Sequence, residues 1–512
     1  MRWPFFAPKN DGITTEHVIK QIERGAKTSL DERAFLEKEI QKYLNSPIYH
    51  DICKAVDYYE GRQDILKHQR TVIGKDGSPI VVKNLPNERI IDNQYAKAVS
   101  QKQNYLCGKP FTMTSENDDY IKAVKPYFSR KFMRTYNSCV LDSVNTSIGY
   151  LHPYYDPEGK LRFKHFRTWE ILPFWKDEEH TELDAFARIY QVQGYTGSTD
   201  KTWTLVDYYT LSGVKHYVYD GDVLIPDVEH PDSSHFEAVI MDGDREERRA
   251  ANWKRIPLVA FKRNSTELPL LNRCKSLQDG INTIVSNFMN NMLEDARNTI
   301  LILVNYDGEN IADFRQNLAQ YGVVKVTTID GQAGDLKKLQ VEVNSQNYNA
   351  ILEILKEALI ENCRSYNVKD ARLNGDANQM HIQSAFADVD LEADDMEIEY
   401  QAAFEDLLWF VNVDLKRTGK GDFFDEELSI TFNRNMLINE QELINNCVSS
   451  KGIISDETIR AKHPWCVSPL KEKRLLEEEQ KAMEANLYDP FGQAGGNATP
   501  TQQPKAKEGA AE

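Results

Sequence analysis

The segment from Leu270 to Leu391 constrains the fold more than any other part of the sequence, because it combines helical and strand-type periodicity in one fixed order. In sequence order the predicted elements are an amphipathic helix (Leu270 to Arg297), a β module (Thr299 to Val343), a second amphipathic helix (Ser345 to Cys363), a polar loop (Ser365 to Met380) and the start of a long acidic helix. Two helices that flank a small β insert are therefore predicted, and no motif of reactive side chains interrupts them.

Each of the two flanking helices has a predicted packed face. In the first helix the apolar stripe is Cys274, Leu277, Ile281, Ile284, Phe288, Met292 and Ala296. Its opposite face, predicted to be wet and nearly uncharged, carries Asn282, Ser286, Asn287, Asn290 and Glu294. The second helix is predicted to pack through Tyr348, Ile351, Leu352, Leu355 and Leu359. Within the β module, strands are predicted at Ile300 to Val304, Val323 to Val326 and Leu339 to Val343, with a short helix around Ile311 to Leu318.

The remainder of the chain predicts an α+β protein. Helical spacing covers Thr14 to Tyr59, Asn93 to Gly108, and roughly Arg130 to Asn145. Between Gly149 and Arg263 the period changes to two, which predicts an antiparallel β domain interrupted by a polar loop from Asp227 to Ala251. Further on we expect a helix (Ile382 to Arg417), a strand (Ser429 to Phe432), a helical region (Asn439 to Asn486) and a disordered tail from Gln493.

The charge and cysteine content exclude several classes of protein. A formal net charge of −17 argues against a chain that holds nucleic acid on a broad basic face, although it does not exclude one past which nucleic acid slides. Seven scattered cysteines without a CxxC pair predict free thiols in a reducing compartment. Neither a signal peptide nor an apolar run long enough for a membrane span is recognisable, so we expect a soluble, intracellular protein.

Motifs of catalysis are missing from the sequence. It has no GxxxxGK[ST] loop, no HExxH pair and no nucleophile elbow, so an enzyme would have to rely on acidic residues alone. The best such group is Asp388, Asp390, Glu392, Asp394, Asp395, Glu397 and Glu399. Because these carboxylates spread around a helix, a solvated face or a subunit contact is favoured. The alternative is a metal-dependent nuclease or phosphoesterase that uses Asp388, Asp390 and Asp394. We predict no catalytic residue, metal or cofactor.

Two polar stretches are candidate binding elements. The loop from Asn367 to Gln379 has mixed charge and small residues, so it is either an ordinary surface connection or a loop that touches a passing polymer. In the β module, Lys325, Lys337 and Lys338 could meet phosphate, although their neighbours are acidic.

From about Tyr58 to Glu484 the sequence resembles the portal (head–tail connector) proteins of long-tailed bacteriophages of Gram-positive bacteria. The order and spacing of several segments carry the resemblance: Asp57-Tyr58-Tyr59-Glu60, Lys102 to Pro110 (KQNYLCGKP), Ile256 to Lys262 (IPLVAFK), Asn305 to Asn310 (NYDGEN), Arg417 to Phe423 (RTGKGDF) and Gly452 to Ser455 (GIIS). The resemblance implies a portal-type fold: mainly α-helical, with an antiparallel β wing, long stem helices, a small α/β clip and a helical crown.

The resemblance also implies boundaries for these parts. They are the N-terminal helical part of the wing (1–148), the β-rich wing (149–269), stem helix 1 (270–298), the clip (299–343), stem helix 2 (344–364), the tunnel loop (365–381), the long wing helix and strand (382–436), the crown (437–490) and a disordered tail (491–512). By the same resemblance the tunnel-loop candidates for the DNA channel are Lys369, Arg372, Asn374, Gly375, Asn378 and Gln379. The candidates for docking at the clip are Tyr306, Asp307, Glu309, Lys325, Lys337 and Lys338.

The implied function is that of a viral structural protein and assembly hub. A cyclic ring, usually of about twelve subunits, would form a channel at one capsid vertex for double-stranded DNA packaging and ejection. It would dock the terminase large subunit and then a head-completion or adaptor protein, and would nucleate procapsid assembly with scaffolding and major capsid proteins. Its place would be the virion, with the host cytoplasm during assembly. An acidic protein with few clustered cations agrees with this function, because it avoids the counterion-release binding that would hold a moving duplex in place.

Overall fold

The computed structural model describes residues 32–73, 77–81, 86–196, 199–242, 245–295, 300–304, 335–339, 345–367, 379–435, 439–466 and 469–487. The chain divides into two compact units. The first contains Met1–Asp370 and Ala385–Met436, and the second contains Ala371–Ser384 and Leu437–Glu512. The boundary between them falls inside helix α10 (Gln379–Arg417). Among the described residues no helix is both long and apolar enough to span a lipid bilayer.

The first unit begins with a series of helices. They are α2 (Glu32–Leu44), α3 (Pro47–Tyr59), η2 (Asp64–Lys67), α4 (Gln94–Cys107), α5 (Asp118–Val124) and α6 (Arg130–Thr146), with short strands β1 (Thr71–Ile73), β2 (Pro79–Val81) and β3 (Thr112–Thr114). Neither η2 nor α5 was predicted, whereas α2, α3, α4 and α6 fall in predicted helical segments. Local signals fix their ends, because Ser46 caps α3 by accepting from the Tyr49 N–H, and Asn93 caps α4 by accepting from the Ala96 N–H. The part of the predicted first helix before Glu32 lies outside the described residues.

The antiparallel β domain is confirmed between Ile148 and Lys262. Its strands are β4 (Ile148–Tyr155), β5 (Leu161–Phe166), β6 (Ile171–Trp175), β7 (Leu183–Thr196), β8 (Thr199–Thr210), β9 (Gly213–Asp220), β10 (Val223–Pro226), β11 (Phe236–Asp242), β12 (Arg245–Ala251) and β13 (Val259–Lys262), with the turn η3 (Thr168–Glu170) between β5 and β6. They form a five-stranded sheet in the order β10-β9-β8-β7-β6, a three-stranded sheet β13-β4-β5 and the hairpin β11–β12.

The prediction of a loop from Asp227 to Ala251 is wrong, because β11 and β12 pair antiparallel from Phe236↔Ala251 to Asp242↔Arg245. A two-stranded ribbon outside the larger sheets buries neither face completely, so its polar sequence lacks the alternation that marks a half-buried strand. Its base is anchored by aromatic packing, with the Phe236 and Trp253 ring centroids 4.9 Å apart.

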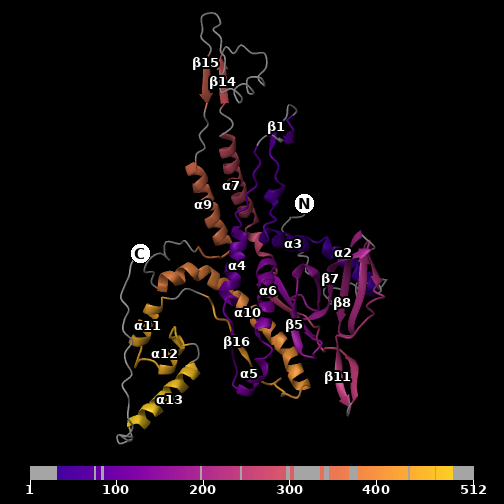
Figure 1. Ribbon diagram of the computed structural model, residues 1–512, viewed down its shortest axis with the longest axis vertical. Coiled ribbons are helices and arrows are strands. Elements are labelled where there is room, and N and C mark those ends of the chain that lie inside the picture. The colour runs from indigo at the N-terminus through magenta and orange to yellow at the C-terminus, as the bar shows by residue number, and fades with distance from the viewer. Residues whose placement is uncertain are drawn as a thin grey trace, which may run out of the picture. The chain divides into compact units, whose positions relative to one another are not determined.

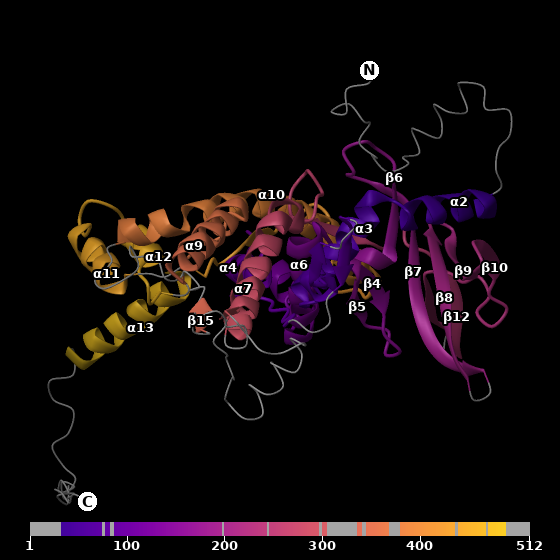
Figure 2. The same ribbon diagram turned by 90° about the horizontal axis from the view of Figure 1, so that it is seen from above.

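Helices cover both of the larger sheets. Leu36 and Ile40 of α2 pack on one face of the five-stranded sheet against Ala187, Val206 and Leu224, and Figure 2 shows α2 lying across these strands. At the other sheet the side chains of α6, β13 and α10 share one aromatic cluster, formed by Tyr136, Phe261, Tyr400 and Phe404. All seven cysteines are free thiols, as predicted.

Two helices, with a pair of antiparallel strands between them in the sequence, extend from this core (Figure 1). They are α7 (Lys275–Asp295), which follows the turn η4 (Leu270–Arg273), and α9 (Ser345–Asn362), and between them β14 (Ile300–Val304) pairs antiparallel with β15 (Asp335–Leu339). The first predicted strand of the β module is confirmed. The predicted helix around Ile311 to Leu318 and the predicted strand Val323 to Val326 lie outside the described residues. Strand β15 lies earlier than the last predicted strand, Leu339 to Val343, because pairing with the aliphatic strand β14 sets its position.

After α10, strand β16 (Ser429–Thr431) pairs antiparallel with β3. The strand predicted from Ser429 to Phe432 is therefore confirmed. Apart from the first residues of α10, the second unit contains α11 (Glu440–Ser449), α12 (Asp456–Lys462) and α13 (Pro469–Leu487), which confirms the predicted helical region. The predicted disordered tail lies outside the described residues. The α+β class is therefore confirmed.

Candidate channel, docking and loop-anchor residues

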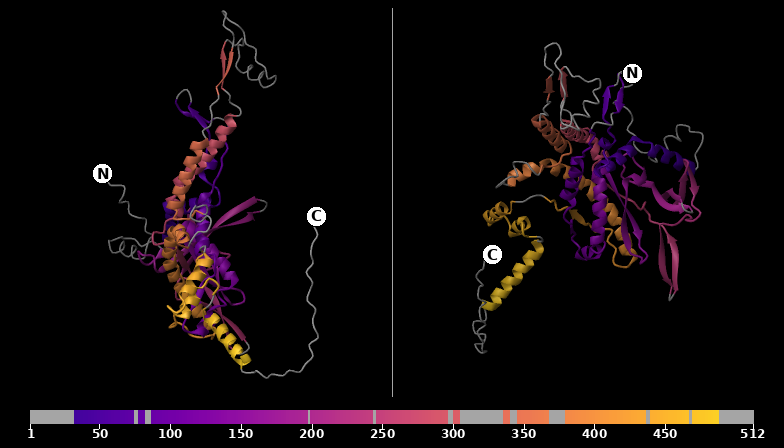
Figure 3. Two further views of the ribbon diagram at one scale, coloured as in Figure 1. Left: turned by 90° about the vertical axis from the view of Figure 1, so that its left-hand side faces the viewer. Right: turned by 45° about the horizontal axis from the view of Figure 1, so that its top comes forward.

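The helices α7 and α9 pack side by side as an antiparallel pair (Figure 3). Leu355 of α9 covers Gly280, where a Cβ would lie 3.5 Å from Leu355 Cδ1. Eight residues further along α7, the Phe288 and Tyr348 ring centroids are 5.1 Å apart, and Asn291 Nδ2 donates to Tyr348 Oη at 2.9 Å. The predicted pair of amphipathic helices is thus a hairpin closed by apolar contacts along one side of each helix.

The polar face of α7 holds an extended segment of the chain, residues 88–92, and the first turn of α4. The Asn290 Oδ1, Ser286 Oγ and Asn282 Oδ1 atoms accept from the backbone N–H groups of Glu88, Ile90 and Asp92 at 2.7, 2.9 and 3.0 Å. Gln278 Oε1 continues the series by accepting from the Tyr95 N–H at 2.9 Å.

The spacing of these bonds follows from the geometry of the two partners. Four residues of α-helix rise about 6 Å, and two residues of extended chain span nearly the same length, so every fourth side chain of α7 meets every second backbone N–H. Asn282, Ser286 and Asn290 are accordingly buried, with at most 4% of their surface exposed. The prediction that this face is wet is wrong for these three residues and holds for Asn287, which is exposed.

Part of the predicted apolar stripes is exposed instead of packed. On α7, Met289 and Met292 are 42% and 49% exposed, and on α9, Ile351 and Ile354 are 45% and 64% exposed. The predicted packing of Met292 and Ile351 is therefore wrong within a single chain. Ile354 lies two residues from Lys356, which pairs with Asp92 at 2.6 Å. Because two residues correspond to about 200° of helix rotation, Ile354 faces away from the segment that Asp92 belongs to.

The chain before the polar loop, at residues 364–366, meets α10 at Phe386 within the first unit. Helix α9 ends in a two-bond cap, in which the Arg364 and Ser365 N–H groups donate to Glu361 O and Ile360 O, and Arg364 takes the left-handed φ of 46°. Beyond it, the Tyr366 ring packs on the Phe386 ring of α10 with centroids 4.4 Å apart. Of the loop candidates, Gln379 is the first residue of α10. The others, Lys369, Arg372, Asn374, Gly375 and Asn378, lie outside the described residues.

Two of the docking candidates lie on the hairpin β14–β15. Lys337 and Lys338 of β15 stand opposite Ile302 and Leu301 of β14. The remaining candidates, Tyr306, Asp307, Glu309 and Lys325, lie outside the described part of the chain.

Five of the seven acidic residues considered as a candidate group on α10 are paired with cations in the structure. Arg434 contacts Asp390, Asp394 and Glu397, the last at 2.9 Å. Glu392 instead points inward to buried cations, and Asp395 lies 3.9 Å from Arg364. No group of three or more His, Cys, Asp or Glu side chains among the described residues is arranged to hold a metal ion. The nuclease alternative therefore has no ligand cluster in this part of the chain.

Residues 44–485 match the family model described as "Phage portal protein, SPP1 Gp6-like". The chain belongs to this portal family. Two curated relatives agree. The chain is 29% identical over 459 residues to the portal protein of Bacillus phage SPP1, which covers 88% of this chain and 89% of the relative. It is 26% identical over 454 residues to the portal protein of Clostridium phage phiCD119, which covers 86% of this chain and 95% of the relative. The predicted resemblance and the predicted portal function are confirmed at the level of the family.

A weaker likeness links this portal-family chain to a solved structure described as "Neck of empty GTA particle computed with C6 symmetry". The match has a TM-score of 0.41 and 9% sequence identity, and it covers 71% of this chain and 88% of the other. At that level the likeness supports no further argument about the portal fold.

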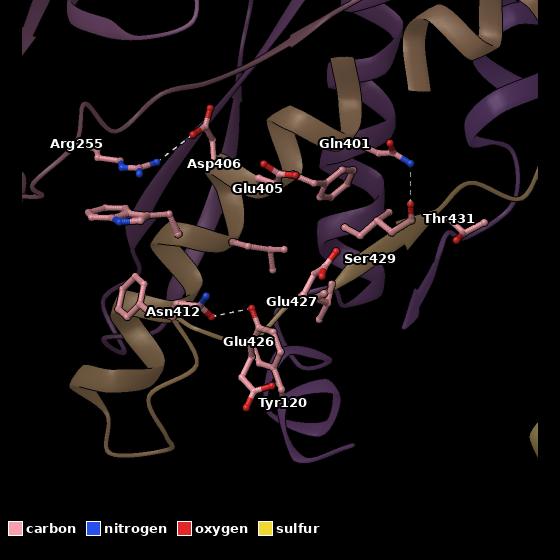
Figure 4. A pocket seen from close by; sticks show the side chains of 16 residues that line it. Tyr120, Arg255, Gln401, Glu405, Asp406, Asn412, Glu426, Glu427, Ser429 and Thr431 are labelled. Carbon is pink, nitrogen blue, oxygen red and sulfur yellow. Dashed lines mark hydrogen bonds and ion pairs between the residues drawn. The ribbon is translucent and has the colours of Figure 1, made fainter. Parts of the chain in front are cut away.

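The portal-family chain also has an open acidic groove of about 630 Å³ beside the C-terminal half of α10 (Figure 4). Its acidic lining residues are Glu405, Asp406, Glu426 and Glu427. Its apolar lining residues include Phe404, Leu408 and Trp409. Arg255 bonds to Asp406 at 3.1 Å, and Tyr120 Oη donates to Asn412 at 3.0 Å. The hydroxyl-bearing residues Ser429 and Thr431 also line the groove.

Sequence reasoning missed several residues that matter for this architecture. The polar repeat at positions 278, 282, 286 and 290 carried a usable signal, because side chains four residues apart lie on one face of a helix and can contact one partner segment. The residues of α4 that contact the ends of the polar loop, Gln101, Lys102 and Tyr105, carried no local signal, since their partners are more than 260 positions away.

Proposed function

We propose that copies of this chain assemble into a closed ring at one capsid vertex, through whose channel double-stranded DNA is packaged and later ejected. Membership of the phage portal family supports this function. One chain cannot surround a duplex, so a channel requires rotational symmetry. By the same proposal, the ring is a component of the virion and nucleates procapsid assembly.

The observation that carries the ring is the apolar surface left exposed on the hairpin of α7 and α9. Met289 and Met292 lie on one helix, and Ile351 and Ile354 lie on the other. One subunit thus offers exposed apolar side chains on two different helices, and we assign these to the two unlike surfaces of a head-to-tail ring contact. Full burial of a large aliphatic side chain contributes about 1.5–3 kcal/mol, and a ring of about twelve subunits repeats this contribution at every contact.

The proposal also covers how DNA moves through the ring and which partners the ring binds. With a formal net charge of −17 the ring would bind the duplex weakly, so that DNA can move through it. We assign weak phosphate contacts to Lys369, Arg372, Asn374, Gly375, Asn378 and Gln379 in the polar loop. We assign docking of the terminase large subunit, and then of a head-completion protein, to the end of the hairpin that carries β14 and β15, with Tyr306, Asp307, Glu309, Lys325, Lys337 and Lys338 as the docking residues. Scaffolding and major capsid proteins are the other expected partners.

Native mass spectrometry of the purified full-length chain tests the ring. We expect a ring of about twelve subunits for the wild type, and smaller species for Ile354→Glu and Met292→Glu, because each places a charge in an apolar subunit contact. Val228→Glu is the matched control, since Val228 is 92% exposed and lies away from both helices in the connection between β10 and β11. A monomeric wild type, or rings that withstand Ile354→Glu and Met292→Glu as well as the control, would contradict the proposal.

A further inference from the structure

One turn of α4 holds the chain where it leaves α9. Gln101 Nε2 donates to Tyr366 O at 3.1 Å, and Gln101 Oε1 accepts from Ser365 Oγ at 2.5 Å. The next residue, Lys102, donates from Nζ to Arg364 O at 3.0 Å. Three consecutive residues after α9 are therefore each bonded to a side chain of α4.

The same turn of α4 also holds α10. The Tyr105 ring stacks on the Phe386 ring with centroids 5.9 Å apart and planes inclined by 20°. Its hydroxyl donates to Asp390 Oδ1 at 2.8 Å. Lys102 Nζ lies 3.5 Å from Glu392, two residues after Asp390 on α10. Residues at positions 101, 102 and 105 share one face of α4, so a single rigid surface contacts both α9 and α10.

The two held stretches touch each other as well. The Tyr366 and Phe386 rings are 4.4 Å apart, and Phe386 also stacks on Tyr105, so one aromatic group joins the end of α9, the early part of α10 and α4. The chain positions that precede and follow the polar loop are thereby fixed against one helix. Tyr105 and Lys102 are buried, with 2% of their surface exposed, so water does not compete for these contacts.

We propose that Gln101, Lys102 and Tyr105 are positioning residues that hold the chain on both sides of the polar loop, at residues 364–366 and 386–392, on the body of the subunit. The inference rests on the proposed portal function for its consequence, namely that a force from DNA on the loop is borne by α4. The physical anchor itself does not depend on that function. Ring contacts are assigned to other residues, so disruption of the anchor should leave the ring intact.

Amide hydrogen exchange on the full-length chain tests the anchor. For Gln101→Ala we expect exchange at the Arg364 and Ser365 amides to accelerate on the order of tenfold or more, because the cap of α9 loses its bonds to α4. Amides of α7 should keep the wild-type rates. The matched control is Asn104→Ala, since Asn104 lies on the same helix, is exposed and bonds only to the Ser100 carbonyl. Unchanged rates at Arg364 and Ser365, or equal acceleration in the control, would overturn the proposal.

A second variant guards against a general loss of folding. Tyr105→Phe keeps the ring that stacks on Phe386 and removes only the hydroxyl that bonds to Asp390. We expect faster exchange confined to Phe386 to Asp390, with ring mass unchanged. Acceleration throughout the first unit would mean that Tyr105 stabilises the core generally, and the positioning role would be wrong.

The functional readout is the amount of DNA per phage particle assembled with each variant. Gln101→Ala should form rings of wild-type mass yet give particles with several-fold less DNA, whereas Asn104→Ala should match the wild type. A loss of rings in Gln101→Ala would assign Gln101 to assembly and overturn the positioning role, as would full DNA content despite faster exchange. A wild type without rings would instead refute the proposed function and leave the exchange result standing.

Discussion

Glu392 is the side chain whose loss should harm this protein most, because it is the anion of a buried charge cluster. It is 2% exposed, and its carboxylate lies 2.5 Å from Arg263, 3.0 Å from Arg273 and 3.5 Å from Lys102. Burial by itself raises the pKa of Glu392, but the three cations outweigh it and hold the pKa below its ordinary value. The cluster joins α10 to α4 and to the chain that follows β13.

Glu392→Gln keeps the shape of the side chain and removes its charge. Arg263 and Lys102 are then buried cations without an anion, with 1% and 2% of their surfaces exposed. Removal of one partner from a buried ion pair costs about 3–5 kcal/mol. The amide oxygen of glutamine still accepts one N–H, so we expect the free energy of unfolding to fall by about 3 kcal/mol.

Urea unfolding of the full-length variants, followed by near-ultraviolet circular dichroism, measures this loss. Asp395→Asn is the control, because Asp395 lies on the same helix, is largely exposed and is 3.9 Å from Arg364, so its loss should change stability by less than about 0.5 kcal/mol. Lys102→Met added to Glu392→Gln should restore part of the stability, since one unpaired cation is removed. A loss below about 1 kcal/mol for Glu392→Gln, or no recovery in the double variant, would refute the reasoning.

Three further predictions concern single positions. Burial lowers the pKa of Lys102 to about 8, so the folded chain releases this proton at a lower pH than the unfolded chain does. In urea unfolding, the stability of the wild type relative to Lys102→Met should therefore rise by about 2–3 kcal/mol between pH 8 and 10.5. A difference that stays constant over this range would contradict the prediction. Arg364→Gly should raise the free energy of unfolding by about 0.5 kcal/mol, because glycine adopts the left-handed φ of 46° without strain. A lower midpoint temperature in thermal unfolding would contradict this prediction. Gly149→Ala should lower stability by at least about 2 kcal/mol in urea unfolding, since its Cβ would lie 2.1 Å from the Cys139 carbonyl oxygen, and wild-type stability would show that β4 can move away from α6.

The sequence by itself determined most of the elements of this chain. The apolar spacing of α7, α9 and α10 is a local property, so each helix could be predicted without knowing its partners. The alternation between Ile148 and Lys262 was equally local, and it predicted antiparallel strands because the turns between them are short. Family resemblance likewise depends on residue order alone, which is why the portal family was recognisable before the fold was known.

Only the tertiary structure decided which polar faces are buried and what they hold. An asparagine on a helix has the same local pattern whether its amide bonds to water or to backbone, and the partners of Asn282 and Asn290 are 190 and 202 positions away. For the same reason the acidic face of α10 gave no sign that Arg434 would neutralise part of it. Hydrogen bonds and ion pairs are satisfied by whatever lies within about 3 Å, and that distance is set by how the whole chain folds, not by the neighbouring residues in sequence.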